Sequence, residues 1–387
     1  MKKIKVLITT SVFSLKNCGG SGVYVYELAK ALSKNNVEVH IFCPGPITTK
    51  QILNKNFVIH WQKTINMPFL KFPSFLFTTI IQANKIIKTE QIDIHHSNGN
   101  AGYFLVDKIP TVTTVHHLPN AEIKYYNLLQ NLLNYLDIFM SYKLMKYSKK
   151  IIAVSNSTYR EIKDMYPSSS NNLVIIKEGV DTKLFNFKEK PNLKLINRKE
   201  SKNIIFFPGG ARGRRKGSEI LFKSLSSLKN EFDFICVVSG KSRELGWSKK
   251  FNTLIKLNAL EKNVLLIGEI DYQELPKFYS IADIVVYPSF FEGFGIPVLE
   301  ALASKRPIIA TKTGEINNII KNNVNGLLIN PGDQTELYNK LKKLLKDKKL
   351  RKKLANNGLN SVNILYDWNN IALEIKNIYQ KFINLIL

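Results

Sequence analysis

Short runs of β-branched and aromatic residues recur along the chain, with helical patterns between most of them. A run of this length suits a buried strand, and repeated alternation of strand and helix is typical of a parallel sheet covered by helices. We therefore predict a Rossmann-like domain over residues 1–184. Its strands are expected in the runs IKVLITT, VEVHIFC, FVIHWQ, IDIHHS, TVTTVHH, IIAVS and LVIIKEG.

A second series of such runs follows a polar interruption. Residues 185–201 are rich in charge and contain Pro191, which predicts a linker. Residues 202–367 are then expected to form a second Rossmann-like domain. Its strands are predicted in NIIFFPG, FDFICVVSG, NVLLIGE, DIVVYPS, PIIATKT and GLLIN. Two domains also suit 387 residues, a length beyond that at which one hydrophobic core stops growing.

The charge of the chain points to an anionic partner without identifying it. The formal net charge is +26, from 56 Lys and Arg against 30 Asp and Glu. Nucleic acid, an anionic membrane surface and a phosphate-bearing substrate all fit such a charge, and so does a base composition that favours Lys, Asn and Ile. Because no nucleic-acid module is present in the sequence, we expect no nucleic-acid partner.

The chain carries no sequence signal for export or for a membrane span. MKKIKVLITTSVF is basic and then apolar, but its apolar run is short and polar-interrupted, which favours a first buried strand over a signal peptide. No apolar stretch reaches about 20 residues.

The three cysteines Cys18, Cys43 and Cys236 lack C-x-x-C spacing, which argues against a disulfide framework or a zinc site. We expect a cytoplasmic protein, and a location at the inner face of the membrane also fits the sequence. Residues 67–88 mix aromatics with lysines and fit either a membrane-facing segment or a core helix with a loop.

The most informative motif is SFFEGFGIPVLEAL, residues 289–302, in which Glu292 and Glu300 lie eight positions apart. Its Gly-Phe-Gly turn can bring backbone N–H groups against an anion, and a helix from Ile296 would direct its positive end there. Carboxylates do not bind phosphate, so their expected partners are hydroxyl groups on either side of it. A sugar nucleotide fits this description.

A basic loop, GGARGRRKGSEILFKSL, follows the first strand of the second series. It is a glycine-rich turn from strand to helix, a position where open α/β sheets bind ligands, and it predicts anion binding. The order of Lys and Gly excludes a P-loop. Its cations are Arg212, Arg214, Arg215 and Lys216.

The first domain offers weaker candidates. Gly20 and Gly22 form a G-x-G turn, but Val25 stands at the third glycine position, so a nicotinamide dehydrogenase is not expected. A tight turn alone explains the pair equally well. His116 ends the run TVTTVHH, on the expected ligand edge, and either it or His117 can be a structural histidine. The absence of metal-ligand spacing and of D-x-D in the sequence predicts no metal site.

Taken together, these motifs resemble the retaining glycosyltransferase family 4, which has the GT-B fold of two Rossmann-like domains facing across a central cleft. The resemblance covers nearly the whole chain. It implies that residues 368–387 form a helix, amphipathic by its apolar spacing, that completes the first domain. The matching elements are the E-x7-E motif EGFGIPVLE, the loop GGSG, Thr114 to His116, IIAVS, NGLLINPGD and YDWNNIA.

The resemblance also assigns roles. Arg212 and Lys216 would clamp the donor diphosphate, Glu300 would hold the ribose, and Glu292 and His116 would face the transferred sugar. A nucleotide-diphosphate sugar is implied as donor substrate, with no permanently bound cofactor, no metal and retained anomeric configuration. The acceptor is expected to be a hydroxyl of a glycan or a lipid-linked molecule of the cell envelope. We further assign to the donor site Gly20, Gly22, Gly210, Gly268, Gly293, Phe294, Gly295 and Ile296.

Three departures from the family pattern leave an alternative open. Ala211 stands where the family has the clamp arginine, Glu178 replaces the Asn of Asn-Gly-Val-Asp, and Lys305 replaces the glycine after the E-x7-E helix. A catalytically weak binding partner of another glycosyltransferase would also fit these changes. A sugar-nucleotide epimerase shares the architecture but not the E-x7-E context. The sequence does not specify the donor, the linkage or the oligomeric state.

Overall fold

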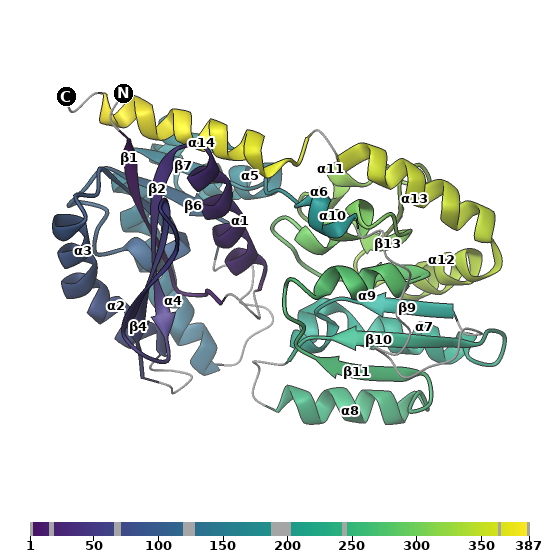
Figure 1. Ribbon diagram of the computed structural model, residues 1–387. Coiled ribbons are helices and arrows are strands. Elements are labelled where there is room, and N and C mark those ends of the chain that lie inside the picture. Colours follow the sequence, from purple (N-terminus) through teal and green to yellow (C-terminus); the bar gives the residue numbers. More distant parts are fainter. Residues whose placement is uncertain are drawn as a thin grey trace. The chain divides into compact units, whose positions relative to one another are not determined.

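The computed structural model describes residues 3–14, 19–65, 71–118, 128–186, 203–241, 246–362 and 365–384 (Figure 1). The chain divides into two compact units, each built around its own sheet. The first contains Met1–Gly179 and Trp368–Leu387, and the second contains Val180–Asp367.

The sheet of the first unit has, within the described ranges, eight strands in the order β3-β4-β2-β1-β5-β6-β7-β8. All the predicted strands of this half form, and all pair in parallel. The additional strand β3 pairs antiparallel at the edge, and its exposed residues lack the apolar pattern that would have predicted it. The strands are β1 (Ile4–Thr10), β2 (Val37–Gly45), β3 (Thr49–Asn54), β4 (Phe57–Lys63), β5 (Ile94–Asn98), β6 (Thr111–Val115), β7 (Lys150–Ala153) and β8 (Leu173–Ile175).

The last helix of the chain belongs to the first unit. Ile371, Ile375 and Tyr379 of α14 are buried in one apolar cluster with Leu28 and Leu32 of α1. The helices of this unit are α1 (Gly20–Lys34), α2 (Lys71–Thr78), α3 (Asn84–Thr89), α4 (Leu128–Tyr147), α5 (Asn156–Met165) and α14 (Trp368–Ile383). A π-helical turn, Thr79–Ala83, joins α2 to α3, and short 3₁₀ turns cover Gly99–Gly102 and Pro167–Asn172.

The second unit has a fully parallel sheet, which in the described part of the chain runs β11-β10-β9-β12-β13-β14. Its six strands were all predicted. They are β9 (Asn203–Phe207), β10 (Phe234–Ser239), β11 (Val264–Gly268), β12 (Ile284–Tyr287), β13 (Ile308–Thr311) and β14 (Leu327–Ile329). The strand order reverses direction between β9 and β12. In open α/β sheets, ligands bind outside the carboxyl ends of the strands at such a switch point.

Helices cover this sheet. They are α6 (Thr182–Phe185), α7 (Ser218–Leu228), α8 (Trp247–Leu257), α9 (Leu275–Ile281), α10 (Ile296–Ala303), α11 (Ile316–Ile319), α12 (Gln334–Lys346) and α13 (Lys348–Val362), with 3₁₀ turns at Gly210–Arg212 and Arg214–Lys216. The lysine-rich α12 and α13 bury a leucine stripe, including Leu337, Leu341 and Leu354, and expose most of their lysines.

The division between the units falls at Gly179, earlier than the predicted residue 184. The physical reason is that α6 packs into the second unit, where the Phe185 ring contacts the rings of Tyr272 and Tyr279. Of the predicted linker 185–201, all but Phe185 and Asn186 lies outside the described residues.

No helix in the described residues is long and apolar enough to cross a membrane. Cys43 and Cys236 are buried free thiols, whereas Cys18 is outside the described ranges. Of the candidate membrane-facing segment 67–88, the structure describes residues from Lys71 onward. There Phe75 and Ala83 are buried, whereas Phe77 and Ile81 are exposed.

Candidate functional site

Two loops meet at the switch point of the second sheet. One follows β9 and holds Arg212 to Gly217, and the other follows β12 and holds Glu292 to Gly295. Gly217 has φ +78°, and a Cβ there would lie 2.1 Å from the carbonyl oxygen of Pro288. Only glycine therefore allows the basic loop to close against the end of β12.

Lys216 is the centre of this junction. It is only 8% exposed, and its Nζ donates to Glu292 Oε1 over 2.6 Å and to the hydroxyl of Tyr287 over 2.7 Å. The same Nζ lies 4.8 Å from the centroid of the Tyr287 ring. Arg215 Nη1 donates to the carbonyl of Phe291 over 3.0 Å and to Glu292 Oε1 over 3.2 Å. Two cations thus converge on one carboxylate oxygen.

Burial and charge act on this cluster in opposition. Burial alone would raise the pKa of Glu292, but the charges of Lys216 and Arg215 outweigh it and lower that pKa to about 2. Burial lowers the pKa of Lys216 to about 8, although Glu292 opposes the shift. At neutral pH the junction therefore holds an ionised carboxylate and a predominantly charged ammonium.

Glu300 has the opposite environment. It lies in α10, is 3% exposed, and its Oε2 accepts a 2.8 Å hydrogen bond from the hydroxyl of Tyr279. Burial raises the pKa of Glu300 to about 7, and the hydrogen bond from Tyr279 and the charge of Arg212 only partly offset it. Glu300 is therefore poised between its neutral and charged forms at physiological pH.

The turn between the two glutamates is fixed by backbone packing. Gly295 has φ +102°, and a Cβ there would lie 2.9 Å from Cγ1 of Ile316. The side chains of Phe294 and Ile296 are 3% and 4% exposed, so a ligand at this turn would meet mainly backbone groups. α10 begins at Ile296, as predicted, with the carbonyl of Gly295 accepting from the N–H of Val298. The first N–H groups of this helix supply positive potential to the turn.

The other donor-site predictions of the second unit lie along the same carboxyl edge. A Cβ on Gly210 would come within 2.3 Å of the Phe207 ring, which explains its lack of a side chain by packing. Arg212 lies beside Gly240, because a Cβ added to Gly240 would lie 3.0 Å from Arg212 Cγ. Gly268 ends β11, and its carbonyl accepts from the N–H of Gly240 over 2.6 Å. Gly293 lies between Glu292 and the turn.

In the first unit, His116 follows β6 at the carboxyl edge of the sheet. Its Nδ1 lies 2.6 Å from Glu178 Oε1 and its Nε2 lies 2.8 Å from Asn98 Oδ1. The Tyr24 ring meets its edge with centroids 4.8 Å apart. Tyr24 belongs to α1, the helix that Gly20 begins and in whose first turn Gly22 is buried. The first-unit candidates therefore share one region.

Several partners in these two clusters were not assigned roles from the sequence. They are Arg215, Tyr287 and Tyr279 in the second unit, and Glu178, Asn98 and Tyr24 in the first. Tyr287 and Asn98 end strands, and a search restricted to polar residues at strand ends would have found them. Tyr279 lies on a helix face and carries no such signal.

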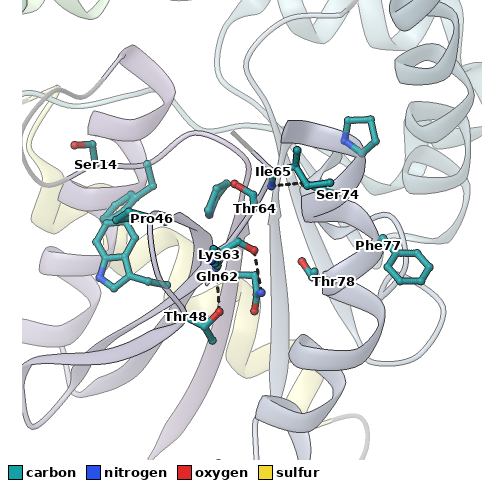
Figure 2. Close-up of a pocket in the computed structure, with 15 residues that line it drawn as sticks. Ser14, Pro46, Thr48, Gln62, Lys63, Thr64, Ile65, Ser74, Phe77 and Thr78 are labelled. Carbon is teal, nitrogen blue, oxygen red and sulfur yellow. Dashed lines mark hydrogen bonds between the residues drawn. The ribbon is translucent and has the colours of Figure 1, made fainter. Parts of the chain in front are cut away.

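The first unit also has a pocket of about 1310 Å³ beyond the ends of β2 and β4 (Figure 2). Gln62 and Lys63 come from β4, and Ser74, Phe77 and Thr78 come from α2. Of the lining residues that the structure describes, none is acidic. The full lining is Phe13, Ser14, Pro44, Gly45, Pro46, Thr48, Trp61, Gln62, Lys63, Thr64, Ile65, Pro73, Ser74, Phe77 and Thr78.

One group of possible metal ligands is found among the described residues. Ligand atoms of His40, His60 and Glu90 all lie within 4.8 Å of one another. Each already has a protein partner, because His40 Nδ1 lies 2.9 Å from His60 Nε2 and Glu90 accepts from Lys50 over 2.7 Å. Burial lowers the pKa of His60 to about 4, so the histidine pair is neutral and satisfied without an ion.

The fold matches solved glycosyltransferase structures. Sucrose-phosphate synthase from Thermosynechococcus elongatus aligns over 99% of this chain and 100% of its own, with TM-score 0.83 and 20% identity. The Anabaena protein HepE, solved in complex with UDP-glucose, aligns over 98% of this chain and 100% of its own, with TM-score 0.72 and 18% identity. Two parallel-sheet α/β units of this kind define the GT-B class.

Sequence comparison extends this class to a family. The model of glycosyltransferase family 4 matches residues 18–184, and that of glycosyl transferases group 1 matches residues 189–361. The chain belongs to this GT-B family of glycosyltransferases. A glycosyltransferase of Methanocaldococcus jannaschii is 25% identical over 97% of this chain and 98% of its own. The MMP alpha-(1→4)-mannosyltransferase of Mycolicibacterium hassiacum is 23% identical over 96% of both chains.

Proposed function

We propose that this glycosyltransferase moves a hexose from a nucleotide-diphosphate sugar to a hydroxyl of a glycan or lipid-linked acceptor, with retention of anomeric configuration and without a metal. The observation that carries the proposal is the junction of Lys216, Arg215 and Glu292 at the switch point of the second sheet. Solved HepE with UDP-glucose supports a nucleotide-sugar donor for this fold.

The donor would lie along the edge that the basic loop and the turn before α10 share. Arg212, Lys216 and the helix N-terminus supply the positive charge that a diphosphate needs. Glu300, on α10, is suited to accept from ribose hydroxyls once it is ionised, and Glu292 to accept from hydroxyls of the sugar. In this assignment the glutamates recognise hydroxyl groups rather than act as an acid and base pair.

The same groups would stabilise the leaving group. When the bond from the anomeric carbon to the phosphate oxygen breaks, negative charge develops on the diphosphate, which fixed cations and helix dipoles stabilise. The acceptor oxygen would bond to the anomeric carbon on the same face, and its proton would pass to the departing phosphate oxygen. The cations of this chain can stabilise the negative charge of the leaving diphosphate, so the scheme requires no metal.

The pocket of the first unit is our candidate for the acceptor. Ring contact between Phe13 and Trp61, with centroids 5.7 Å apart, gives it an apolar side. Trp61 Nε1 donates to Gln51 over 2.9 Å, so the indole N–H is already satisfied. Lys63 and the hydroxyls of Ser14 and Thr78 supply polar groups. Aromatic, hydroxyl and ammonium groups together suit a saccharide with an anionic or apolar attachment.

A helical face beside the pocket supports action at a membrane surface. Phe77 and Ile81 are 67% and 61% exposed, and Lys85 and Lys88 continue the same face, also exposed. Apolar residues followed by lysines on one face suit an anionic membrane surface.

We expect the protein to float with anionic liposomes at low salt, and we expect the double change Phe77→Ser and Ile81→Ser to reduce the floated fraction. No flotation of the unaltered protein would exclude peripheral membrane binding but not transfer.

The direct test is turnover. The purified protein, incubated with a panel of nucleotide sugars, should release nucleoside diphosphate from at least one of them, and EDTA should leave the rate unchanged. With an acceptor, NMR of the product should show the anomeric configuration of the donor. Glu292→Ala should abolish release, whereas Glu274→Gln, a change in an exposed ion pair, should not. No release from any donor would contradict the proposal.

The departures from the family pattern favour one alternative, a catalytically weak partner of another glycosyltransferase. In the structure Lys216 and Arg215 both form ion pairs with Glu292, and Ala211 stands where the family has the clamp arginine. Binding of a nucleotide sugar without release of nucleoside diphosphate would favour this alternative.

A further inference from the structure

The ring of His116 faces two hydrogen-bond acceptors. One is the carboxylate of Glu178, 2.6 Å from Nδ1, and the other is the amide oxygen of Asn98, 2.8 Å from Nε2. The neutral imidazole has one N–H and can donate to only one of them. With Glu178 as a carboxylate, both contacts are hydrogen bonds only when the ring carries a proton on each nitrogen.

The orientation of the Asn98 amide follows from its other contact. The Thr10 hydroxyl donates to the carbonyl of Val12 over 3.1 Å, and its oxygen accepts from Asn98 Nδ2 over 3.2 Å. The amide nitrogen therefore points to Thr10 and the amide oxygen to His116. A flipped amide would satisfy the Thr10 contact only if the hydroxyl gave up its hydrogen bond to the Val12 carbonyl.

We propose that Glu178 is a positioning residue that holds His116 as a doubly protonated, positively charged ring. Its carboxylate is 5% exposed and the His116 side chain is 13% exposed, so the two charges form a shielded pair. Such a pair is strong where a lone buried carboxylate would be unfavourable. The role of the pair in transfer rests on the function proposed above.

The surroundings accommodate one positive ring and not several. Two buried titratable neighbours are His96, which feels the charge of His116, and Tyr24, whose ring packs on the imidazole. Burial, aided by the charge of His116, lowers the pKa of His96 to about 3, so His96 stays neutral. Burial raises the pKa of Tyr24, with a contribution from Glu178, so Tyr24 stays a neutral phenol. His96 and Tyr24 both contact the Thr114 hydroxyl, at 2.7 and 3.1 Å, which ties them to β6.

This arrangement limits what His116 can do in transfer. Both ring N–H groups are directed into the first unit, and neither nitrogen has a lone pair available. His116 therefore does not accept the acceptor's proton. It presents a fixed positive charge at the carboxyl edge of its sheet, suited to a phosphate or a developing anion.

The test is the protonation state of His116, read directly by long-range ¹H–¹⁵N NMR of protein labelled at its six histidines. At pH 7.5 the His116 resonances, assigned by their loss in His116→Asn, should show two protonated ring nitrogens. In Glu178→Gln, which keeps an acceptor but removes the charge, they should show one bare nitrogen. Glu38→Gln removes the carboxylate facing His40 Nε2 at 3.2 Å and should leave the His116 signals unchanged.

Activity separates this inference from the proposed function. Glu178→Gln should lower kcat at least about tenfold with a smaller change in KM, since a charge stabilising the transition state is lost. Glu38→Gln should not change either constant. A bare nitrogen on His116 in the unaltered protein would overturn the inference even if transfer proceeds. Double protonation without any transfer would leave the inference intact and remove the proposed function.

Discussion

Glu292 and Glu300 lie eight residues apart and are both buried, yet the protein drives their pKa values in opposite directions. Glu292, in the loop after β12, accepts from Lys216 and Arg215 and has a pKa of about 2. Glu300, inside α10, has a neutral Tyr279 as its hydrogen-bond donor and a pKa of about 7. Burial acts to raise both pKa values, but the charges of Lys216 and Arg215 outweigh it at Glu292, whereas Tyr279 and Arg212 only partly offset it at Glu300. The motif spacing therefore does not define two equivalent carboxylates.

The largest expected effect comes from removing the cation that makes this difference. Lys216→Ala leaves Glu292 buried with Arg215 alone, and breaking a buried pair destabilises a protein by about 3–5 kcal/mol. We expect loss of that order in the free energy of unfolding, measured by urea denaturation, and no detectable transfer. Lys250→Ala, in an exposed pair with Glu219, should lose no more than about 1 kcal/mol. Equal losses would show that the Lys216 pair is not special.

Glu292→Gln should destabilise the fold at neutral pH. Because the folded pKa of about 2 is below the ordinary value of 4.5, the carboxylate stabilises the fold above pH 4.5, and this contribution is lost as the pH falls toward 2. The difference corresponds to about 3 kcal/mol. Urea denaturation of both proteins between pH 3 and pH 7 should show the gap closing at low pH; a constant gap would contradict this account.

Glu300→Gln should act in the opposite direction. Its folded pKa of about 7 lies above 4.5, so ionisation opposes folding increasingly from pH 4.5 to 7 and fully above 7. A neutral glutamine removes this penalty, so at pH 8 the variant should be more stable by up to about 3 kcal/mol, with no difference at pH 4. Glu274→Gln, an exposed control, should be neutral at both values. Destabilisation at pH 8 would show that Glu300 is held as a favourable carboxylate.

The smallest effect concerns the end of α10. Lys305 has φ +55°, a left-handed conformation that is unfavourable for a residue with a Cβ. Lys305→Gly should therefore stabilise the protein by about 1 kcal/mol, and Ser304→Gly, at φ −76°, should destabilise it by about 0.5–1 kcal/mol. Thermal unfolding of both variants provides the check. If both destabilise, the strain at Lys305 is relieved by contacts of its side chain.

The sequence predicted the strands well because buried parallel strands need continuous apolar runs, such as IKVLITT and NIIFFPG. It did not predict β3, whose exposed residues have no apolar alternation. It placed the domain boundary at 184 because the polar, charged segment that starts at Phe185 was interpreted as a linker. The contact of Phe185 with Tyr279, which assigns α6 to the second unit, links residues 94 positions apart and has no local signal.

The sequence proposed individual residues for the candidate site but not the contacts between them. The motifs singled out Lys216, His116 and Glu292 as candidates because they follow strands, and Glu300 because of its spacing from Glu292. They did not show that Lys216 is buried, that Arg215 shares its carboxylate, or that Glu178 faces His116 across 62 positions. Such pairings depend on the order of strands in the sheet, which spacing alone does not fix. The roles assigned to these residues in transfer remain predictions.

The central claim is that the edge between β9 and β12 binds a nucleotide-diphosphate sugar through Lys216. Thermal unfolding with a panel of nucleotide sugars tests it most directly, when each protein is compared with and without the nucleotide sugar. We predict that at least one donor stabilises the unaltered protein, by about 2.7 kcal/mol at 100 times its Kd, and that the same donor does not stabilise Lys216→Ala. Failure of every nucleotide sugar to stabilise the unaltered protein, or equal stabilisation of both proteins, would contradict the account.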